Sequence, residues 1–391
     1  MTDNKDNFIF TSESVSEGHP DKICDQISDL IVDMYMEADK NSRVACETLT
    51  TTNRVILSGE VKINENIESV NNEKINGRIR EKIKEIGYEQ DGFHWQDLKI
   101  ENYLHKQSQD ISQGVDSDKF IGAGDQGIMF GFACSETKSL MPAPIFYSHN
   151  ILRALSEYRR NNETFFGPDS KSQVSMEYVN GKPQSISSIV VSTQHLADVK
   201  ISEIRSKVIE IVESSIPSEI LPESKQILIN PTGRFVVGGP DGDTGLTGRK
   251  IIVDTYGGSA PHGGGAFSGK DYTKVDRSAA YIARYLAKNV VASKLAKKCL
   301  IQLSYAIGVA QPISIYLKTD KESEVNSKKI IEIINSYVDL SPEGIKTYLK
   351  LDRPIYQPTA TYGHFGREFD SNTGSFSWEK TDLAEKISND Y

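Results

Sequence analysis

The stretch His262-Gly-Gly-Gly-Ala-Phe-Ser-Gly-Lys-Asp271 places four glycines within ten residues and ends in a lysine and an aspartate. An apolar, strand-like run, Lys250–Asp254, precedes it, and helical spacing of apolar residues predicts a helix from Val275 to Val291 after it. A glycine-rich loop between a strand and a helix lets backbone N–H groups approach an anion, and the helix N-terminus adds partial positive charge. The stretch therefore predicts a polyphosphate site in a chain of mixed strands and helices.

A phosphate-loop NTPase is the first alternative for this stretch. Gly264 to Lys270 fit the spacing Gly-x-x-x-x-Gly-Lys, but the motif continues with a Ser or Thr that binds magnesium, and Asp271 stands there instead. That reading also needs a metal-binding strand aspartate downstream, whereas Asp254 lies upstream. The sequence therefore disfavours a standard phosphate-loop NTPase.

Composition limits the class of protein. The 391 residues are enough for two or three domains, and no apolar run reaches the roughly 18 residues of a membrane helix. The N-terminus is polar, and the net charge of −9 disfavours nucleic-acid binding. The four cysteines are scattered: Cys24, Cys46, Cys134 and Cys299. We therefore expect a cytoplasmic protein with no membrane or nucleic-acid partner.

Strand and helix patterns recur in each third of the chain. The first third is predicted to contain helices over 23–34 and 75–86, the latter capped by Gly87, and strands over 44–52 and 54–63. The middle third is predicted to contain helices over 148–160 and 201–214 and strands over 172–179, 185–193 and 226–237. The last third adds strands across 300–317, a helix over 323–337 and a short helix after Ser341. This alternation suggests a threefold relation without an evident sequence repeat.

Three further segments carry groups typical of a ligand site. In His19-Pro-Asp-Lys22, Asp21 either complements a helix dipole or binds a metal while His19 and Lys22 contact a phosphate, and the segment alone leaves both readings open. Gly122–Gly127 matches a bare dinucleotide pattern in the wrong context, so a glycine-rich turn carrying Asp125 is favoured. Gly238–Lys250 combines five glycines with charged residues and can line one site with the 262–271 stretch.

Other charged residues are ambiguous when taken singly. Asp169, Lys171, Arg234 and Phe235 read as ordinary surface charges or a packed aromatic. Glu47 and Glu60 lie on adjacent predicted strands. One register places them on the same face, although exposed strand carboxylates need no function.

Taken together, these segments resemble the S-adenosylmethionine synthetase (methionine adenosyltransferase) family. The matching pieces run in the family's order between Phe8 and Thr381: Thr11–Lys22, Ala45–Thr48, Gly122–Gly127, Asn230–Phe235, Gly245–Gly258, His262–Asp271, Lys274–Ala280 and Tyr362–Arg367. A non-catalytic relative would be expected to lose site residues, whereas this chain keeps a full set of cations and carboxylates.

The resemblance implies an α/β (α+β) fold of three similar strand–helix domains related by pseudo-threefold symmetry and interleaved in sequence. We divide the chain into domains over 8–106, 120–237 and 238–381, with a mobile active-site loop over 107–119. It also implies a homodimer with shared active sites, doubled to a homotetramer. ATP and L-methionine would react, and the triphosphate would be cleaved to pyrophosphate and phosphate before release. Two Mg²⁺ per site and K⁺ are the implied cofactors.

The resemblance also implies roles for individual residues. Those implied in catalysis are His19, Asp125, Lys171, Arg249 and Lys270. ATP binding would involve His19, Asp169, Lys171, Arg234, Phe235, Asp243, Arg249, Lys250, Ala266 and Lys270. Methionine binding would involve Glu60, Gln107, Asp243 and Lys274. Asp21 and Asp276 resemble the magnesium ligands, and Glu47 resembles the potassium-site residue.

Four positions depart from the family's pattern. His105 and Gln109 stand where Gly and Pro are expected in the loop, which changes its predicted hinge stiffness. Asp241 adds an acid beside the phosphate-binding cations, and Tyr272 replaces an expected Pro. The first two changes bear on gating and Asp241 on ATP affinity, rather than on the class of reaction, and Tyr272 has no clear consequence.

Overall fold

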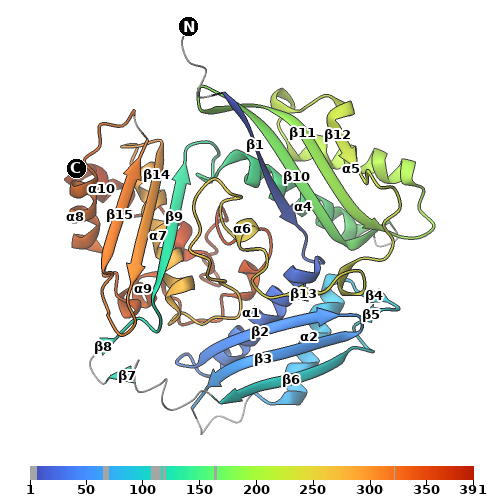
Figure 1. The fold of residues 1–391 in the computed structure, drawn as a ribbon, viewed down its shortest axis with the longest axis horizontal. Coiled ribbons are helices and arrows are strands. Elements are labelled where there is room, and N and C mark those ends of the chain that lie inside the picture. Colours follow the sequence, from blue (N-terminus) through green and yellow to red (C-terminus); the bar gives the residue numbers. More distant parts are fainter. Residues whose placement is uncertain (1–6, 65–69, 107–115, 118–119, 163–164, 321) are drawn as a thin grey trace.

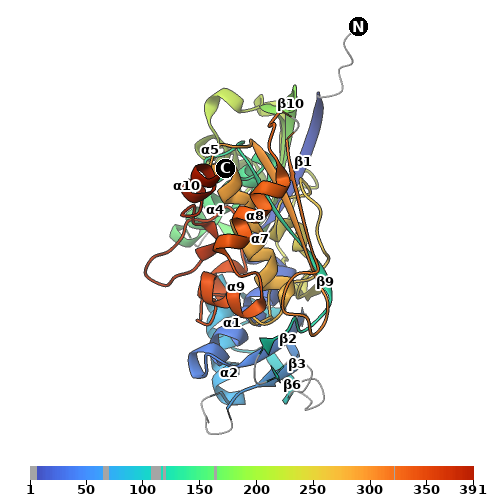
Figure 2. The same cartoon turned by 90° about the vertical axis from the view of Figure 1, so that its left-hand side faces the viewer.

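Three β-sheets, each covered by helices on one face, make up the molecule (Figure 1). The computed structural model describes residues 7–64, 70–106, 116–117, 120–162, 165–320 and 322–391. Turned by 90°, the molecule has its strands on one side and most of its helices on the other (Figure 2). The buried apolar residues lie between these layers. The predicted α/β class is confirmed.

The first sheet has the strand order β13-β2-β3-β6. Its strands are β13 (Gly245–Leu246), β2 (Arg43–Thr51), β3 (Arg54–Lys62) and β6 (Lys99–Lys106). Helices α1 (Pro20–Ala38) and α2 (Asn72–Ile86) pack beside it, and Gly87 ends α2 with φ 98° as predicted. A small hairpin, β4 (Glu89–Gln90) with β5 (Phe93–His94), completes this region, and a second, β7 (Asp116–Ser117) with β8 (Phe120–Ile121), precedes β9 of the third sheet.

The second sheet has the order β1-β10-β11-β12 and the third the order β15-β14-β9. The second consists of β1 (Phe8–Val15), β10 (Phe166–Val179), β11 (Lys182–His195) and β12 (Ile227–Ile229), with α4 (Ala143–Asn161) and α5 (Ile201–Ser215) against it. The third consists of β9 (Gly127–Cys134), β14 (Lys298–Tyr305) and β15 (Ser314–Thr319). Around it lie α7 (Val275–Ala292), α8 (Ser327–Tyr337), α9 (Pro342–Leu349) and α10 (Ala384–Asp390).

Each sheet includes a strand from a distant part of the chain. β1 pairs antiparallel with β10, β9 pairs antiparallel with β14, and β13 pairs antiparallel with β2. This exchange of strands is the interleaving that the family resemblance implied. Short 3-10 helices occupy several connections: Ser218–Ile220, Ser224–Gln226, Gly239–Asp241, Gln357–Thr359 and Ser377–Glu379.

One predicted strand is wrong, and another is shorter than predicted. Residues 251–254 form a short helix, α6 (Ile251–Asp254), in which Asp254 turns inward to pair with Lys22 of α1. The β-branched composition that predicted a strand is therefore overridden by tertiary contacts. Of the predicted strand over 226–237, only β12 forms, since Asn230 with φ 40° and Pro231 turn the chain away. Among the described residues, no helix is both long and apolar enough to cross a bilayer.

Candidate functional site

The N-terminal turn of α1 holds the loop of residues 239–250 in place. Asp21 accepts hydrogen bonds from the backbone N–H of Leu246 (3.0 Å) and from Lys250 Nζ (2.7 Å). One turn later, Asp25 accepts from the backbone N–H of Gly248 at 2.9 Å. Burial raises the pKa of Asp21, but the hydrogen bonds from Lys250 and Leu246 outweigh it and lower the pKa below its usual value. Asp21 is therefore an anion among cations.

His19 is the N-cap of α1 and is buried. Its Nδ1 accepts a hydrogen bond from the backbone N–H of Asp21 at 3.2 Å. Burial, followed by the charges of Lys250 and Lys171, lowers the pKa of His19 to about 3. At neutral pH the imidazole is uncharged and lies among cations, with Arg249 Nε 3.7 Å from Asp21 on the same turn.

Lys22 is engaged in ion pairs inside the protein, which favours a structural role over the phosphate contact that one of the two readings gave it. Its side chain is buried, and Nζ donates to Asp25 (2.9 Å) and to Asp254 (2.5 Å). Although burial alone lowers the pKa of Lys22, the two carboxylates raise it above its usual value, so the ammonium stays charged. Lys22 links α1 to α6 and is a structural residue.

Asp169 lies beside the start of the 239–250 loop. Its Oδ2 accepts from the backbone N–H of Gly239 at 2.9 Å, while Oδ1 is buried without a hydrogen-bond partner. Burial raises the pKa of Asp169 to about 6. The backbone of Phe235 exchanges hydrogen bonds with His195, whereas the side chains of Arg234 and Asp243 are exposed. Asp169, which has one oxygen without a hydrogen-bond partner, thus lies near the segment that carries the exposed Arg234.

The end of the 262–271 loop adds onto the edge of β2. Cys46 N donates to Gly269 O at 2.9 Å, and Lys270 forms an isolated bridge with Ala45. Asp271, which broke the phosphate-loop pattern, is buried and accepts from the backbone N–H of Val44 at 2.7 Å. The carboxylate is an anchor between loop and strand, which explains why no magnesium-binding hydroxyl stands there. The phosphate-loop reading is therefore excluded.

Lys270 projects from this anchored end. Its Nζ lies 2.6 Å from Asp276 Oδ2 on the first turn of α7, and both side chains are partly exposed. Lys274 instead pairs with the buried Asp271. Burial raises the pKa of Glu47 on β2, and the Lys270 ammonium opposes that shift, so Lys270 lies near Glu47 as well.

Glu47 and Glu60 lie on the same face of the first sheet, as one of the two readings predicted. The register pairs Glu47 with Ser58 and Ala45 with Glu60, and residues of equal parity on paired strands share a face. His105, one of the departures from the family pattern, lies on β6 with Nε2 3.7 Å from Glu60 Oε1. This face is opposite to the one that buries Val44, Cys46 and their neighbours against the helices.

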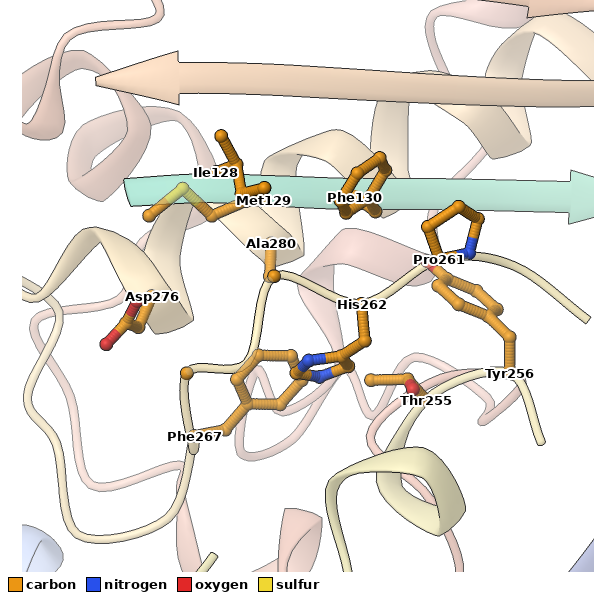
Figure 3. Close-up of a pocket in the computed structure, with 12 residues that line it drawn as sticks. Ile128, Met129, Phe130, Thr255, Tyr256, Pro261, His262, Phe267, Asp276 and Ala280 are labelled. Carbon is orange, nitrogen blue, oxygen red and sulfur yellow. The ribbon is translucent and has the colours of Figure 1, made fainter. Parts of the chain in front are cut away.

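The 262–271 loop also roofs a small cavity over β9 (Figure 3). His262 and Phe267 line it from the loop and Asp276 from α7, while His262 Nδ1 accepts from the backbone N–H of Gly264 at 2.8 Å. A Cβ on Gly265 would lie 2.3 Å from the Asp276 carboxylate, so this loop passes directly against α7. With a volume of about 10 Å³, the cavity holds at most a water molecule, and any nucleotide must bind on the open surface outside it.

The structure brings the two glycine-rich loops into contact. A Cβ on Gly248 would lie 2.5 Å from Ala266 Cβ, so the loop anchored on Asp21 touches the loop that carries Lys270. Asp125 is exposed at the turn before β9, where it accepts from Gln126 N at 2.7 Å. Gln107 and Gln109 lie outside the described residues.

The two remaining departures, Asp241 and Tyr272, make local contacts. A Cβ on Gly92 would lie 2.0 Å from the Asp241 carboxylate, so Asp241 packs on the turn between β4 and β5. Tyr272 donates to the backbone oxygen of Lys40 at 3.1 Å.

Sequence reasoning singled out Asp21 but missed its anchoring role and the three further aspartates that position these loops. Asp21, Asp25, Asp29 and Asp33 are spaced by four residues on one face of α1, and each accepts backbone N–H groups from a distant segment. Asp29 binds Gly269 N at 2.9 Å and pairs with Arg277 of α7, and Asp33 binds Tyr356 N and Gln357 N. The signal was the regular i, i+4 spacing of acids on a predicted buried helix.

Comparison with known proteins gives consistent matches along the chain. Residues 7–109, 120–235 and 237–380 match the N-terminal, central and C-terminal domain models of S-adenosylmethionine synthetase. An S-adenosylmethionine synthase of Parvibaculum lavamentivorans is 58% identical over 386 residues, with 98% of each chain covered. One of Rhodospirillum centenum is 58% identical over 390 residues, again with 98% of each covered. One of Pelagibacter ubique is 58% identical over 391 residues, covering 98% of this chain and 99% of the relative.

Proposed function

The chain belongs to the S-adenosylmethionine synthetase family, and from this premise we propose that it joins ATP and L-methionine by attack of the methionine sulfur on ribose C5′. The enzyme class, S-adenosylmethionine synthase, follows from the family. In the proposed reaction the triphosphate leaves whole and is hydrolysed to pyrophosphate and phosphate before release.

The chemistry of this reaction accounts for the kinds of residue at the site. Methionine sulfur is a neutral nucleophile that loses no proton, so no general base is required. The protein must instead align sulfur with C5′, stabilise the departing polyanion and tolerate a new sulfonium cation. Cations therefore serve the triphosphate, and carboxylates serve the sulfonium.

The observation that carries the proposal is the cluster at the start of α1. A buried, uncharged His19 at a helix N-terminus lies near Lys171 and Lys250, with Arg249 on the adjoining loop. A neutral imidazole and backbone N–H groups donate hydrogen bonds to phosphate oxygens, while the cations neutralise the charge that develops on the leaving group. Lys270, on the loop that touches this one, would complete the set of cations.

The proposed metal ions would each bind a single protein carboxylate rather than a preformed site of several protein ligands. Among the described residues, no three His, Cys, Asp or Glu side chains gather as a metal site. Magnesium commonly uses one or two protein carboxylates and takes its other oxygens from water and phosphates. Asp21 and Asp276, each paired with a lysine, would hold the two Mg²⁺ together with the triphosphate, and Glu47 would hold K⁺. These ions would supply charge neutralisation for the triphosphate.

The remaining residues are proposed to bind the adenosine part of ATP and the methionine. Arg234, Phe235, Asp169 and Ala266 would flank the nucleotide. Glu60, Gln107, Asp243 and Lys274 would bind methionine, and Asp125 with Asp243 would face the sulfonium. The exposed carboxylates of Asp125 and Asp243 support this division, because they are free to receive a cationic group.

A homodimer, doubled to a homotetramer, is part of the proposal. Lys171 lies on the open face of the second sheet, and Glu47 and Glu60 lie on that of the first, while the open face of the third sheet exposes the apolar side chains of Ile128 and Tyr316. Exposed apolar surface of this kind marks protein contacts. A partner covering these faces would enclose the site between two chains. We place the reaction in the cytoplasm, in keeping with four free cysteines.

Product analysis tests the function. Purified protein is mixed with ATP, L-methionine, magnesium and potassium, and the products are separated and quantified. We expect S-adenosylmethionine together with equal amounts of pyrophosphate and phosphate. Release of intact triphosphate would refute the hydrolytic step, and ADP or the lack of any methionine-dependent product would refute the adenosyl transfer.

A further inference from the structure

A second, larger cavity lies away from the candidate site, between α4, α7 and the C-terminal segment 366–376. Its volume is about 790 Å³, within the range of small-molecule pockets. Helices α4 and α7, which form part of its walls, lie on the helix side of the molecule (Figure 2).

Two arginines line this cavity without a carboxylate partner. Arg153 of α4 donates to Tyr362 O (2.9 Å) and Asn150 Oδ1 (3.3 Å), and its Nε is buried without a hydrogen-bond partner. Arg367 donates to Thr361 O (2.9 Å) and Gly363 O (3.4 Å). The two guanidinium groups therefore hold carbonyl oxygens of three consecutive residues and lie close together. No ion pair within the described part of the chain involves either of them.

The acidic side chains of the cavity are engaged elsewhere. Both oxygens of Glu379 are taken, by Arg284, Lys288 and the backbone N–H of Gly366. Asp370 accepts from the backbone N–H of Asn372 and from Thr373 Oγ1 in its own turn. Glu368 is exposed. Burial and then the neighbouring Arg153 lower the pKa of Arg367 to about 9, so both guanidiniums are charged at neutral pH and repel each other.

We propose that this cavity is an anion site, separate from the candidate active site, which binds the phosphate oxyanion of a small metabolite between Arg153 and Arg367. Planar guanidinium groups bind phosphate in a bidentate manner, and an oxyanion would satisfy the free Nε of Arg153 while removing the repulsion. Lys138 is exposed at the same cavity and adds a third cation. Phe146, Phe369 and Phe376 form apolar walls for the rest of the ligand.

Calorimetric titration with sodium pyrophosphate in the presence of EDTA tests the proposal. We expect the wild-type protein to bind pyrophosphate in this cavity, and Lys270→Ala, which alters only the candidate active site, to retain that binding. Arg367→Gln should weaken it by about tenfold or more, because a charge-assisted pair is lost. Lys138→Gln should weaken it by about threefold, and Lys40→Gln, an exposed lysine elsewhere, should leave it unchanged.

Two results would overturn the proposal. One is wild-type affinity in Arg367→Gln when near-ultraviolet circular dichroism shows a native fold. The other is loss of all pyrophosphate binding in Lys270→Ala, which would assign the binding to the candidate active site alone. If Arg367→Gln does not fold, Lys138→Gln decides, and an unchanged affinity in that variant refutes the site.

Discussion

Lys270 and Lys274 lie close together in sequence but pair with carboxylates of different exposure. Lys274 pairs with a buried anchor, Asp271, whereas Lys270 pairs with the partly exposed Asp276 on the open side of the loop. Only Lys270 is therefore free to exchange its carboxylate for a phosphate. The sequence alone suggested both as site residues, since spacing does not reveal which carboxylate each lysine meets.

Lys270→Ala should lower the turnover of the enzyme by about 100-fold or more, because a cation facing the leaving group stabilises the transition state. The chain should remain folded, since the ion pair of Lys270 is with a partly exposed carboxylate. Initial rates of S-adenosylmethionine formation measure the effect, with Lys225→Ala, whose side chain is 77% exposed, as a control away from the site. Turnover within a factor of two of the wild type would remove Lys270 from the phosphate-binding set.

His149 should make folding stability depend on pH. It is buried, its Nδ1 bonds Ser14 Oγ at 2.7 Å, and burial, followed by Arg153 and Arg367, lowers its pKa well below the usual value. Below about pH 6.5 the unfolded chain gains a proton that the folded chain does not, so stability falls as the pH drops.

Between pH 8 and pH 5 the free energy of unfolding should therefore fall by about 2 kcal/mol more in the wild type than in His149→Gln. Urea unfolding at both pH values measures this difference. His105→Gln, whose side chain is 64% exposed, serves as the surface control. Equal pH responses of wild type and His149→Gln would contradict the assignment.

At the scale of elements, α1 organises the candidate site. The helix itself was predictable from its apolar spacing, as were β2, β3 and α7. The anchoring role of its four aspartates, Asp21, Asp25, Asp29 and Asp33, could not be predicted, because the backbone N–H groups that they bind belong to segments distant in sequence. Strand β9 escaped prediction for the same reason, since its partner β14 lies far along the chain. Local sequence patterns thus predict helices and strands, whereas the positions of the 239–250 and 262–271 loops depend on contacts with residues distant in sequence.

The junction between the 262–271 loop and β2 leaves no room for a side chain at Gly269. A Cβ there would lie 2.0 Å from Cys46 O, and φ is 84°. Gly264, in the same loop, has φ 96°, but a Cβ at that position would meet no atom within 4 Å. Substitution of Gly264 would therefore introduce backbone strain alone, whereas substitution of Gly269 would introduce both strain and a steric clash.

Gly269→Ala should lower the free energy of unfolding by about 3 kcal/mol or more, and Gly264→Ala by about 1 kcal/mol. Urea midpoints of the two variants test this difference. Because Lys270 follows Gly269 directly, the first variant should also lose activity. Equal stability of the two variants would mean that the loop end is not held against β2.

At the scale of the whole molecule, one side carries strands and loops and the other carries helices (Figure 2). On the third sheet, Ile128 and Tyr316 are exposed by 44% and 49%, on the face opposite to α7. Fold class and family were predictable from sequence motifs. The shared use of one open side by all three sheets was not, because it depends on how the sheets are placed relative to one another.

The double variant Ile128→Asp, Tyr316→Asp should shift the protein toward monomer, because two buried charges would oppose contact between apolar faces. Activity should fall with the dimer, since the proposed sites are shared. Sedimentation velocity at micromolar concentration measures the shift, with Tyr337→Asp on the helix side as control. A fully active monomer would contradict shared sites.

The exchange of strands between sections bears on how the chain acquires its structure during synthesis. The first sheet needs β13, and α1 needs the N–H of Gly269, which follows Asp29 by 240 residues. β9 likewise waits for β14, and β1 for β10. Contacts so distant in sequence form slowly, because the entropy cost of closing a long loop precedes the stabilising contacts that the closure allows. A nascent chain on the ribosome therefore exposes unpaired strand edges until its last third emerges, and that interval is when it most needs protection from aggregation.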